Sequence, residues 1–176
     1  MTPEAGKPWP RLLLGGLLFG GAAWLLLSFR DRYVVLLLAG ALLAWQGLPA
    51  GLKARALLLT AAGCLLDFTI AGLGLYRFVG VGVLPLWRVV LWLSFSCWWL
   101  RLLAVWRPSP RLLALIGELA GPLVCWGGLQ LRALQAGAPP WLALLILAPL
   151  WAALLAWTSR LLPGEDSRLG QARDCG

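Results

Sequence analysis

Asp67 is the residue of this sequence that most needs a chemical explanation, because it interrupts the apolar stretch GCLLDFTIAGLG at residues 63–74. A carboxylate at the centre of a bilayer costs about 2.5 to 3.5 kcal/mol, so it requires a partner, a wet cavity or a proton. On a helix, Asp67 shares one face with Gly63, Ala71 and Gly74. Small-residue faces are where membrane helices approach one another closely, so we expect Asp67 to face neighbouring helices and not lipid.

A second carboxylate, Glu118, lies beside a similar stripe of small residues. That stripe consists of Gly117, Gly121, Cys125 and Gly128. The two stripes could pack together, and Pro122 removes the amide hydrogen that the carbonyl of residue 118 would otherwise accept. Arg101 is expected near the depth of Glu118, and two interpretations stay open: an ion pair with Glu118, or a side chain that extends to the lipid headgroups.

Other kinds of chemistry are limited by what the sequence lacks. It contains no histidine, which excludes the usual zinc sites, Ser-His-Asp triads and His-ligated haems. The four cysteines have no C-x-x-C spacing: Cys64, Cys97, Cys125 and Cys175. No phosphate-loop or dinucleotide fingerprint is present. We therefore expect no metal, no cofactor and no disulfide, and the sequence favours a role other than that of an enzyme.

The elements that carry these residues are predicted to be membrane-spanning helices. Of the 176 residues, 61% are apolar and 12% are charged, and the mean hydropathy is +0.83. A bilayer core about 30 Å thick needs roughly 20 apolar residues per helix. The sequence predicts an all-α polytopic transmembrane bundle with short loops and six spans, at residues 12–29, 33–49, 56–76, 86–106, 112–131 and 141–159. These form one domain, residues 1–162, followed by a disordered cytoplasmic tail, residues 163–176.

The basic residues indicate the orientation of the chain. Its net charge of +8 does not indicate nucleic-acid binding, because the basic residues lie singly or in pairs at the ends of apolar runs. With six spans, ten of the 15 basic residues fall on one side of the membrane, which predicts that both termini are cytoplasmic. Thirteen arginines against two lysines are typical of a GC-rich bacterial genome. We therefore expect a multi-pass protein of a bacterial inner membrane.

Tryptophans are abundant, and three of the twelve are unusually placed. Tryptophan favours the headgroup region, where its ring is apolar and its N–H stays hydrated. Trp92, Trp98 and Trp99 instead fall in the middle of the fourth span. Three interpretations stay open: these tryptophans face lipid, line an apolar pocket between helices or, as we expect, pack in the core.

From residue 63 to residue 134 the sequence resembles an uncharacterised bacterial membrane family, domain of unknown function 2878. Three segments carry the resemblance: GCLLDFTIAGLGLYRF at 63–78, PLWRVVLWLSF at 85–95 and LIGELAGPLVCWGGLQLRAL at 115–134. The resemblance implies that eight positions belong to the family pattern: Asp67, Phe78, Pro85, Trp87, Trp92, Gly117, Gly121 and Pro122. It implies a multi-pass architecture and no reaction.

Three functional hypotheses follow. The leading one is an accessory or binding protein that handles a lipid or another apolar molecule between the third, fourth and fifth spans. A second is a small proton-coupled transporter that uses Asp67 and Glu118 as relay groups, although no inverted repeat is visible. A third is a lipid-modifying enzyme within the membrane, with one carboxyl as acid or base. The expected partners are the bilayer, a lipid ligand, and another membrane protein or a second copy of the chain.

Overall fold

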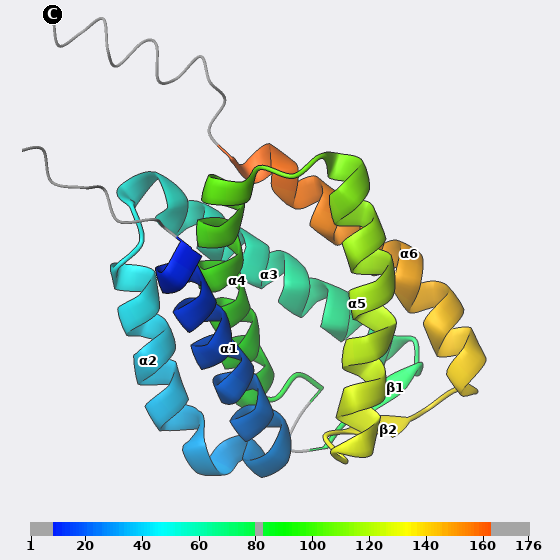
Figure 1. Ribbon diagram of the computed structural model, residues 1–176. Helices are drawn as coiled ribbons and strands as arrows, with labels where there is room; N and C mark the ends of the chain where they lie inside the picture. Colours follow the sequence, from blue (N-terminus) through cyan, green and yellow to red (C-terminus); the bar gives the residue numbers. More distant parts are fainter. Residues whose placement is uncertain (1–8, 80–82, 163–176) are drawn as a thin grey trace, which may run out of the picture.

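The computed structural model describes residues 9–79 and 83–162. Within these ranges it contains six α-helices and one pair of short strands, so the predicted all-α bundle is confirmed (Figure 1). The elements are α1 (Trp9–Phe29), η1 (Arg30–Tyr33), α2 (Val34–Gln46), α3 (Ala50–Gly72), β1 (Tyr76–Phe78), α4 (Leu86–Trp106), α5 (Pro110–Gln130), β2 (Leu134–Ala136), α6 (Pro140–Thr158) and η2 (Ser159–Leu161). The predicted tail, residues 163–176, lies outside the described residues.

Five of the six helices are long and apolar enough to cross a membrane, and the exception is α2. With 13 residues, α2 is about 20 Å long, which is shorter than the roughly 30 Å hydrocarbon core. Its role as one of six spans stays a prediction. α3 begins at Ala50 and not at residue 56, because Lys53 and Arg55 interrupt the apolar run without ending the helix.

The central helix of the bundle is α4, against which α1, α2 and α3 all pack. Half of its candidate span is buried, compared with 6% for α1. A helix with neighbours on several sides must be apolar around most of its circumference, and the sequence of α4 meets this requirement. In Figure 1, α1 and α2 run in opposite directions along one side of α4, while α5 and α6 form a pair on the other side of the molecule.

The last four helices form two units with the same order of elements, α3–β1–α4 and α5–β2–α6. The first helix of each unit ends in the same way. Gly74 and Arg132 have positive φ angles of 74° and 54°. The amide that follows each of them donates to a carbonyl of the helix: Leu75 N to Ile70 O at 3.2 Å, and Ala133 N to Gly128 O at 2.8 Å. This is the Schellman helix end, in which a left-handed residue satisfies the last carbonyls of the helix.

The strands β1 and β2 join these two units. They pair antiparallel, with Arg77 opposite Gln135 at the centre of the register. Each of these two residues lies three positions after the left-handed residue of its own unit. The local twofold axis of the antiparallel ladder therefore passes between equivalent positions of the two units. The sequence does not predict these strands, because three residues are too few to show the alternation that identifies a strand.

The small-residue stripes do not pack against each other, because each receives a tryptophan. A Cβ atom at Gly63 would overlap the indole of Trp92, and one at Gly121 would lie 2.5 Å from Trp151 Cγ. The indoles of Trp92 and Trp151 are themselves stacked, with ring centres 5.3 Å apart. The two glycines thus make room for an aromatic pair that connects α4 to α6.

The other members of the stripes have separate local roles. Gly117 allows close approach of the α6 backbone at Trp151, and Gly128 makes room for Leu134. Gly74 supplies the left-handed turn, and Ala71 is only partly buried. The glycines of the two stripes therefore serve packing or chain reversal.

Candidate functional site: a buried ion pair and an apolar groove

Asp67 is completely buried, with 0% of its surface exposed. It lies five residues before the end of α3, about 8 Å from that end. The sequence predicts a position near the middle of the span, and the observed position differs because α3 begins six residues earlier than predicted and ends four residues earlier, at Gly72. Arg88 is the third residue of α4, so α3 and α4 bring the two charges to a similar height.

Both carboxylate oxygens of Asp67 accept two hydrogen bonds each. Oδ1 accepts from the Tyr76 hydroxyl at 2.6 Å and from Arg88 Nη2 at 3.1 Å. Oδ2 accepts from Arg88 Nε at 2.5 Å and from Trp92 Nε1 at 2.5 Å. Three elements, α3, β1 and α4, therefore meet at one side chain. The carboxylate has a full set of donors, which is the condition under which a buried charge is tolerated.

Aromatic rings complete the surroundings of Arg88. Its guanidinium carbon lies 5.6 Å from the centre of the Phe78 ring and 5.8 Å from that of Trp92. These rings attract the cation through their π faces and exclude water. The Arg88 side chain is 5% exposed, so the ion pair is sealed inside the bundle.

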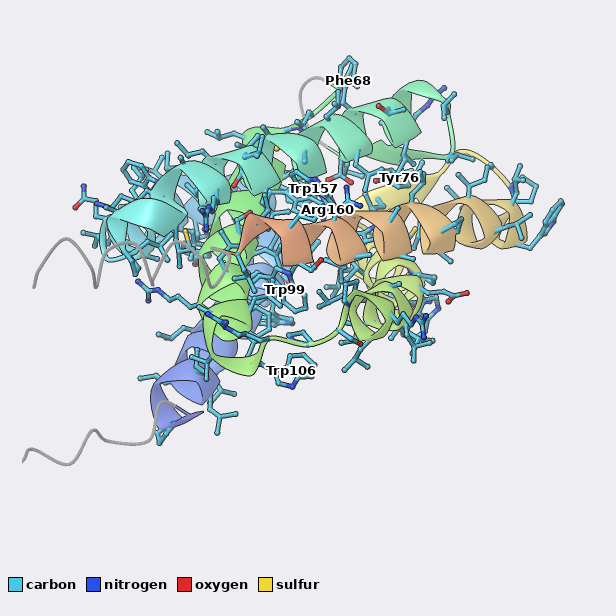
Figure 2. All side chains as sticks on the ribbon, turned by 90° about the horizontal axis from the view of Figure 1, so that it is seen from above. Phe68, Tyr76, Trp99, Trp106, Trp157 and Arg160 are labelled. Atoms are coloured by element: carbon cyan, nitrogen blue, oxygen red, sulfur yellow. The ribbon has the colours of Figure 1, made fainter. Side chains whose placement is uncertain are left out.

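Tyr76 lies in β1, outside the candidate spans. Figure 2 shows its side chain within the bundle, whereas Phe68, nearby on α3, points away from it. Burial and then the negative charge of Asp67 raise the pKa of the Tyr76 phenol, so the hydroxyl keeps its proton and donates a hydrogen bond to Asp67. The void beside Tyr76, Arg88 and Cys125 measures only about 10 Å³, at most the room that one water molecule needs.

Glu118 and Arg101 do not belong to this cluster. Glu118 is exposed on α5. Arg101 is exposed on α4, and its Nη2 donates to Ala44 O at 3.0 Å, one of the last carbonyls of α2, which have no partner within the helix. Arg101 is thus bonded to α2, and the alternative in which it pairs with Glu118 does not occur in the described part of the chain.

The three tryptophans of the fourth span have three different surroundings. Trp92 binds Asp67, and Trp99 donates to Thr158 Oγ1 at 3.1 Å, which links α4 to the end of α6. Both are buried. Only Trp98 lines a sizeable pocket, where its ring stacks on Phe19 with centres 5.3 Å apart. The three tryptophans therefore do not line one common pocket.

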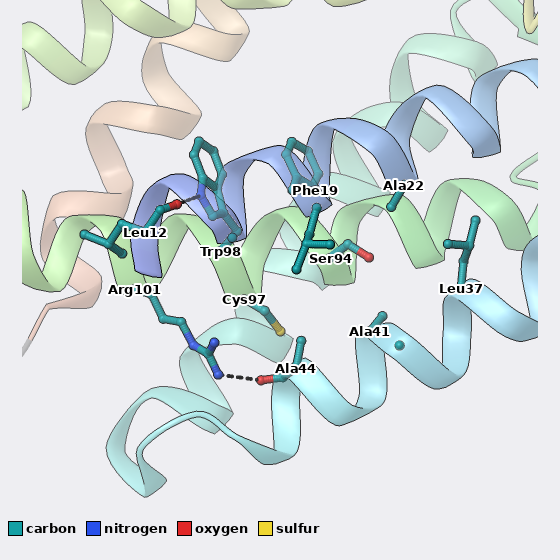
Figure 3. Close-up of a pocket in the computed structure, with 13 residues that line it drawn as sticks. Leu12, Phe19, Ala22, Leu37, Ala41, Ala44, Ser94, Cys97, Trp98 and Arg101 are labelled. Carbon is teal, nitrogen blue, oxygen red and sulfur yellow. Dashed lines mark hydrogen bonds between the residues drawn. The ribbon is translucent and has the colours of Figure 1, made fainter. Parts of the chain in front are cut away.

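The pocket beside Trp98 is an apolar groove between α1, α2 and α4, with a volume of about 340 Å³ (Figure 3). Small residues of α1 and α2 leave the space, and Trp98 and Phe19 form an aromatic wall. Arg101 lies at one end, beside Ala44 (Figure 3). We call this pocket the α1–α2–α4 groove; its lining residues are Leu12, Gly15, Leu18, Phe19, Ala22, Leu37, Gly40, Ala41, Ala44, Ser94, Cys97, Trp98 and Arg101.

Sequence reasoning missed Arg88 and Tyr76, the two partners that explain Asp67. Arg88 was counted with the basic residues outside the membrane, because it lies close to the start of its span. In the predicted spans, Asp67 lies nine residues from the connection between the third and fourth helices and Arg88 only two, so the pairing becomes evident only because α3 ends at Gly72.

The fold and the site define a helical membrane protein organised around a buried ion pair. The chain belongs to the family described as protein of unknown function (DUF2878), whose model matches residues 12–157. The resemblance seen in the sequence is thus confirmed. No curated protein and no solved structure matches the chain.

Proposed function

We propose that this protein binds an anionic lipid, with an acyl chain in the α1–α2–α4 groove and the headgroup at Arg101. The observation that carries the proposal is the combination of an apolar groove of about 340 Å³ with a guanidinium at one end. This volume is within the range of ligand pockets, about 300 to 1,000 Å³. The site is not the one between the third, fourth and fifth spans that the sequence suggested, because the void there is far smaller.

Arg101 suits an anionic headgroup because only part of its donor capacity is used within the described structure. Its Nη2 donates to Ala44 O, whereas a guanidinium carries five N–H donors in a planar fork. The side chain is exposed and lies five residues before the end of α4, about 8 Å from that end. A phosphate just above the groove would be within reach of such a long side chain.

The Asp67 cluster supports a structural role better than a proton relay. Its carboxylate accepts four hydrogen bonds and is fully buried, so a proton could reach it only after the ion pair opens. Glu118 is exposed on a different helix, and the structure does not bring the two acids together. Neither the transporter nor the enzyme hypothesis gains a specific observation.

We place the protein in a bacterial inner membrane with both termini in the cytoplasm. The basic residues favour this orientation, and the start of α1 and the end of α6 lie toward the same end of the bundle in Figure 1. Arg101 is then close to the cytoplasmic leaflet, which is the leaflet that carries a negative surface potential.

A groove-filling substitution tests the proposal. Gly40 lines the groove, and a Cβ at this position meets no atom within 4 Å, so Gly40→Leu should fill the groove without a backbone clash. Native mass spectrometry of the purified protein with added phosphatidylglycerol or phosphatidylcholine measures the bound lipid. We expect the wild type to retain phosphatidylglycerol, Gly40→Leu to lose most of it, and Arg101→Gln to bind the two lipids alike.

Gly21→Leu is the matched control, because Gly21 is an exposed glycine of α1 that does not line the groove, and a Cβ added there would also meet no atom within 4 Å. This variant should retain lipid as the wild type does. Equal lipid retention by Gly40→Leu and Gly21→Leu would overturn the assignment of the groove as the lipid site.

A further inference from the structure

We propose that the face of α5 that carries Glu118 binds a transmembrane helix of another membrane protein, and that this helix presents an arginine or lysine at the depth of Glu118. The face consists of Leu115, Glu118, Pro122 and Trp126, which follow one another at helical spacings of three, four and four. We call it the Glu118 face. The inference does not depend on the lipid groove, which lies between other helices.

The described residues of the single chain leave the Glu118 face uncovered. α5 packs mainly on α6, through Gly117 and Gly121. Leu115 and Trp126 are 53% and 60% exposed, and Glu118 is exposed between them. Exposed leucine and tryptophan are normal on a lipid-facing helix, but an exposed carboxylate is not.

The depth of Glu118 makes its exposure costly. It is the eighth residue after Pro110, the first residue of α5, and therefore lies about 12 Å from the start of the helix. Ionisable residues within membrane helices almost always face a bundle interior or a wet cavity, or pair with one another. Glu118 has none of these within the described part of the chain, and we infer that a neighbouring membrane protein supplies its partner.

The backbone adds a second acceptor at the same place. Residue 122 is proline, which has no amide hydrogen, so the carbonyl of Glu118 lacks its usual helical donor. A carboxylate and a carbonyl that has lost its usual donor together favour a partner with several donors in a medium without water. Arginine and lysine supply several donors and the opposite charge.

A second copy of the same chain fits this face less well than a different protein. Two copies in the same orientation that meet through this face would place their Glu118 carboxylates at the same depth. The basic residue of α5 nearest along this side is Arg111, seven positions earlier and about 10 Å higher. A symmetric pair would therefore bring like charges together.

Model peptides in vesicles test the proposal. Protein labelled with a fluorescence donor is reconstituted in phosphatidylcholine vesicles with one of two polyleucine peptides labelled with an acceptor. One peptide carries a single arginine eight residues from one end of its hydrophobic segment, and the other has leucine at that position. Energy transfer reports association. We expect the arginine peptide to bind roughly three- to thirtyfold more tightly than the leucine peptide, and Glu118→Leu to abolish the difference.

Leu123→Ala is the control, because Leu123 is 64% exposed on α5 but does not belong to the Glu118 face; it should keep the preference for arginine. Both variants change exposed side chains, and an unchanged elution profile in detergent shows that they fold. Equal binding of the two peptides, or a preference that survives Glu118→Leu, refutes the proposal. If two labelled copies of the protein show energy transfer to each other, and Glu118→Leu removes it, the face is assigned to a second copy instead.

Discussion

Asp67→Asn should destabilise the protein by about 3 to 5 kcal/mol, although it changes the shape of the side chain very little. The reason lies in the two pairs of donors around the carboxylate, since Oδ1 faces Tyr76 and Arg88, and Oδ2 faces Arg88 and Trp92. Asparagine has one oxygen and one NH₂ group. Whichever way the amide is turned, its NH₂ meets two donors.

The magnitude follows from those two mismatched contacts. A buried donor without an acceptor costs about 1 to 3 kcal/mol, and the charge of Arg88 also loses its counterion in a site where it is 4% exposed. Breaking a buried pair by removing one partner typically costs about 3 to 5 kcal/mol. Replacing both charges costs much less, so the double variant Asp67→Asn with Arg88→Met should cost at least about 2 kcal/mol less than the sum of the two single variants.

Unfolding in mixed detergent micelles with increasing dodecyl sulfate, followed by tryptophan fluorescence, measures these differences. Glu118→Gln is the control, because Glu118 is exposed in the folded chain and its surroundings in the micelle change little on unfolding, so this variant should change stability by no more than about 0.5 kcal/mol. If Asp67→Asn is as mild as Glu118→Gln, or if the two single variants add without coupling, the ion pair does not stabilise the bundle as proposed.

Three further substitutions test the packing around the pair. Gly63→Ala should destabilise the protein by about 1 to 3 kcal/mol, because the new methyl group overlaps the Trp92 indole. Gly127→Ala, where the methyl group meets no atom within 4 Å, should be neutral or slightly stabilising. The same unfolding titration compares the two variants, and equal effects would contradict the close packing at Gly63. Tyr76→Phe removes one hydrogen bond and should cost about 1 kcal/mol; no loss of stability would show that this bond is dispensable. Trp99→Phe removes the link from α4 to α6 and should raise the rate of proteolysis at the end of α6; an unchanged rate would show that the link does not hold this end.

The helices could be predicted from the sequence because lipid solvation leaves a strong signal: long apolar runs end at prolines, glycines and charges. The start of α3 was misplaced because hydropathy marks where a run becomes apolar, whereas a helix continues through Lys53 and Arg55 as long as its backbone hydrogen bonds are made. α2 was assigned a full span for the related reason that its apolar run extends beyond its 13 helical residues.

The site was only partly predictable. The charge of Asp67 and its small-residue face indicate that the carboxylate needs partners on neighbouring helices. Which hydrogen-bond donors these are depends on how the chain returns through β1 and enters α4. Tyr76 carries no charge and stands at the predicted end of the third span, so nothing in the sequence marks it as a partner of Asp67. The groove could not be seen at all, because it arises where small residues of α1 and α2 fail to fill the space beside Trp98.

The most direct test of lipid binding is an experimental structure of the protein in nanodiscs that contain phosphatidylglycerol. The proposed function predicts continuous acyl-chain density in the groove between α1, α2 and α4, with the phosphate within hydrogen-bonding distance of the Arg101 guanidinium. A groove closed by direct packing of α1 on α2, or ordered lipid elsewhere with none beside Arg101, would contradict it.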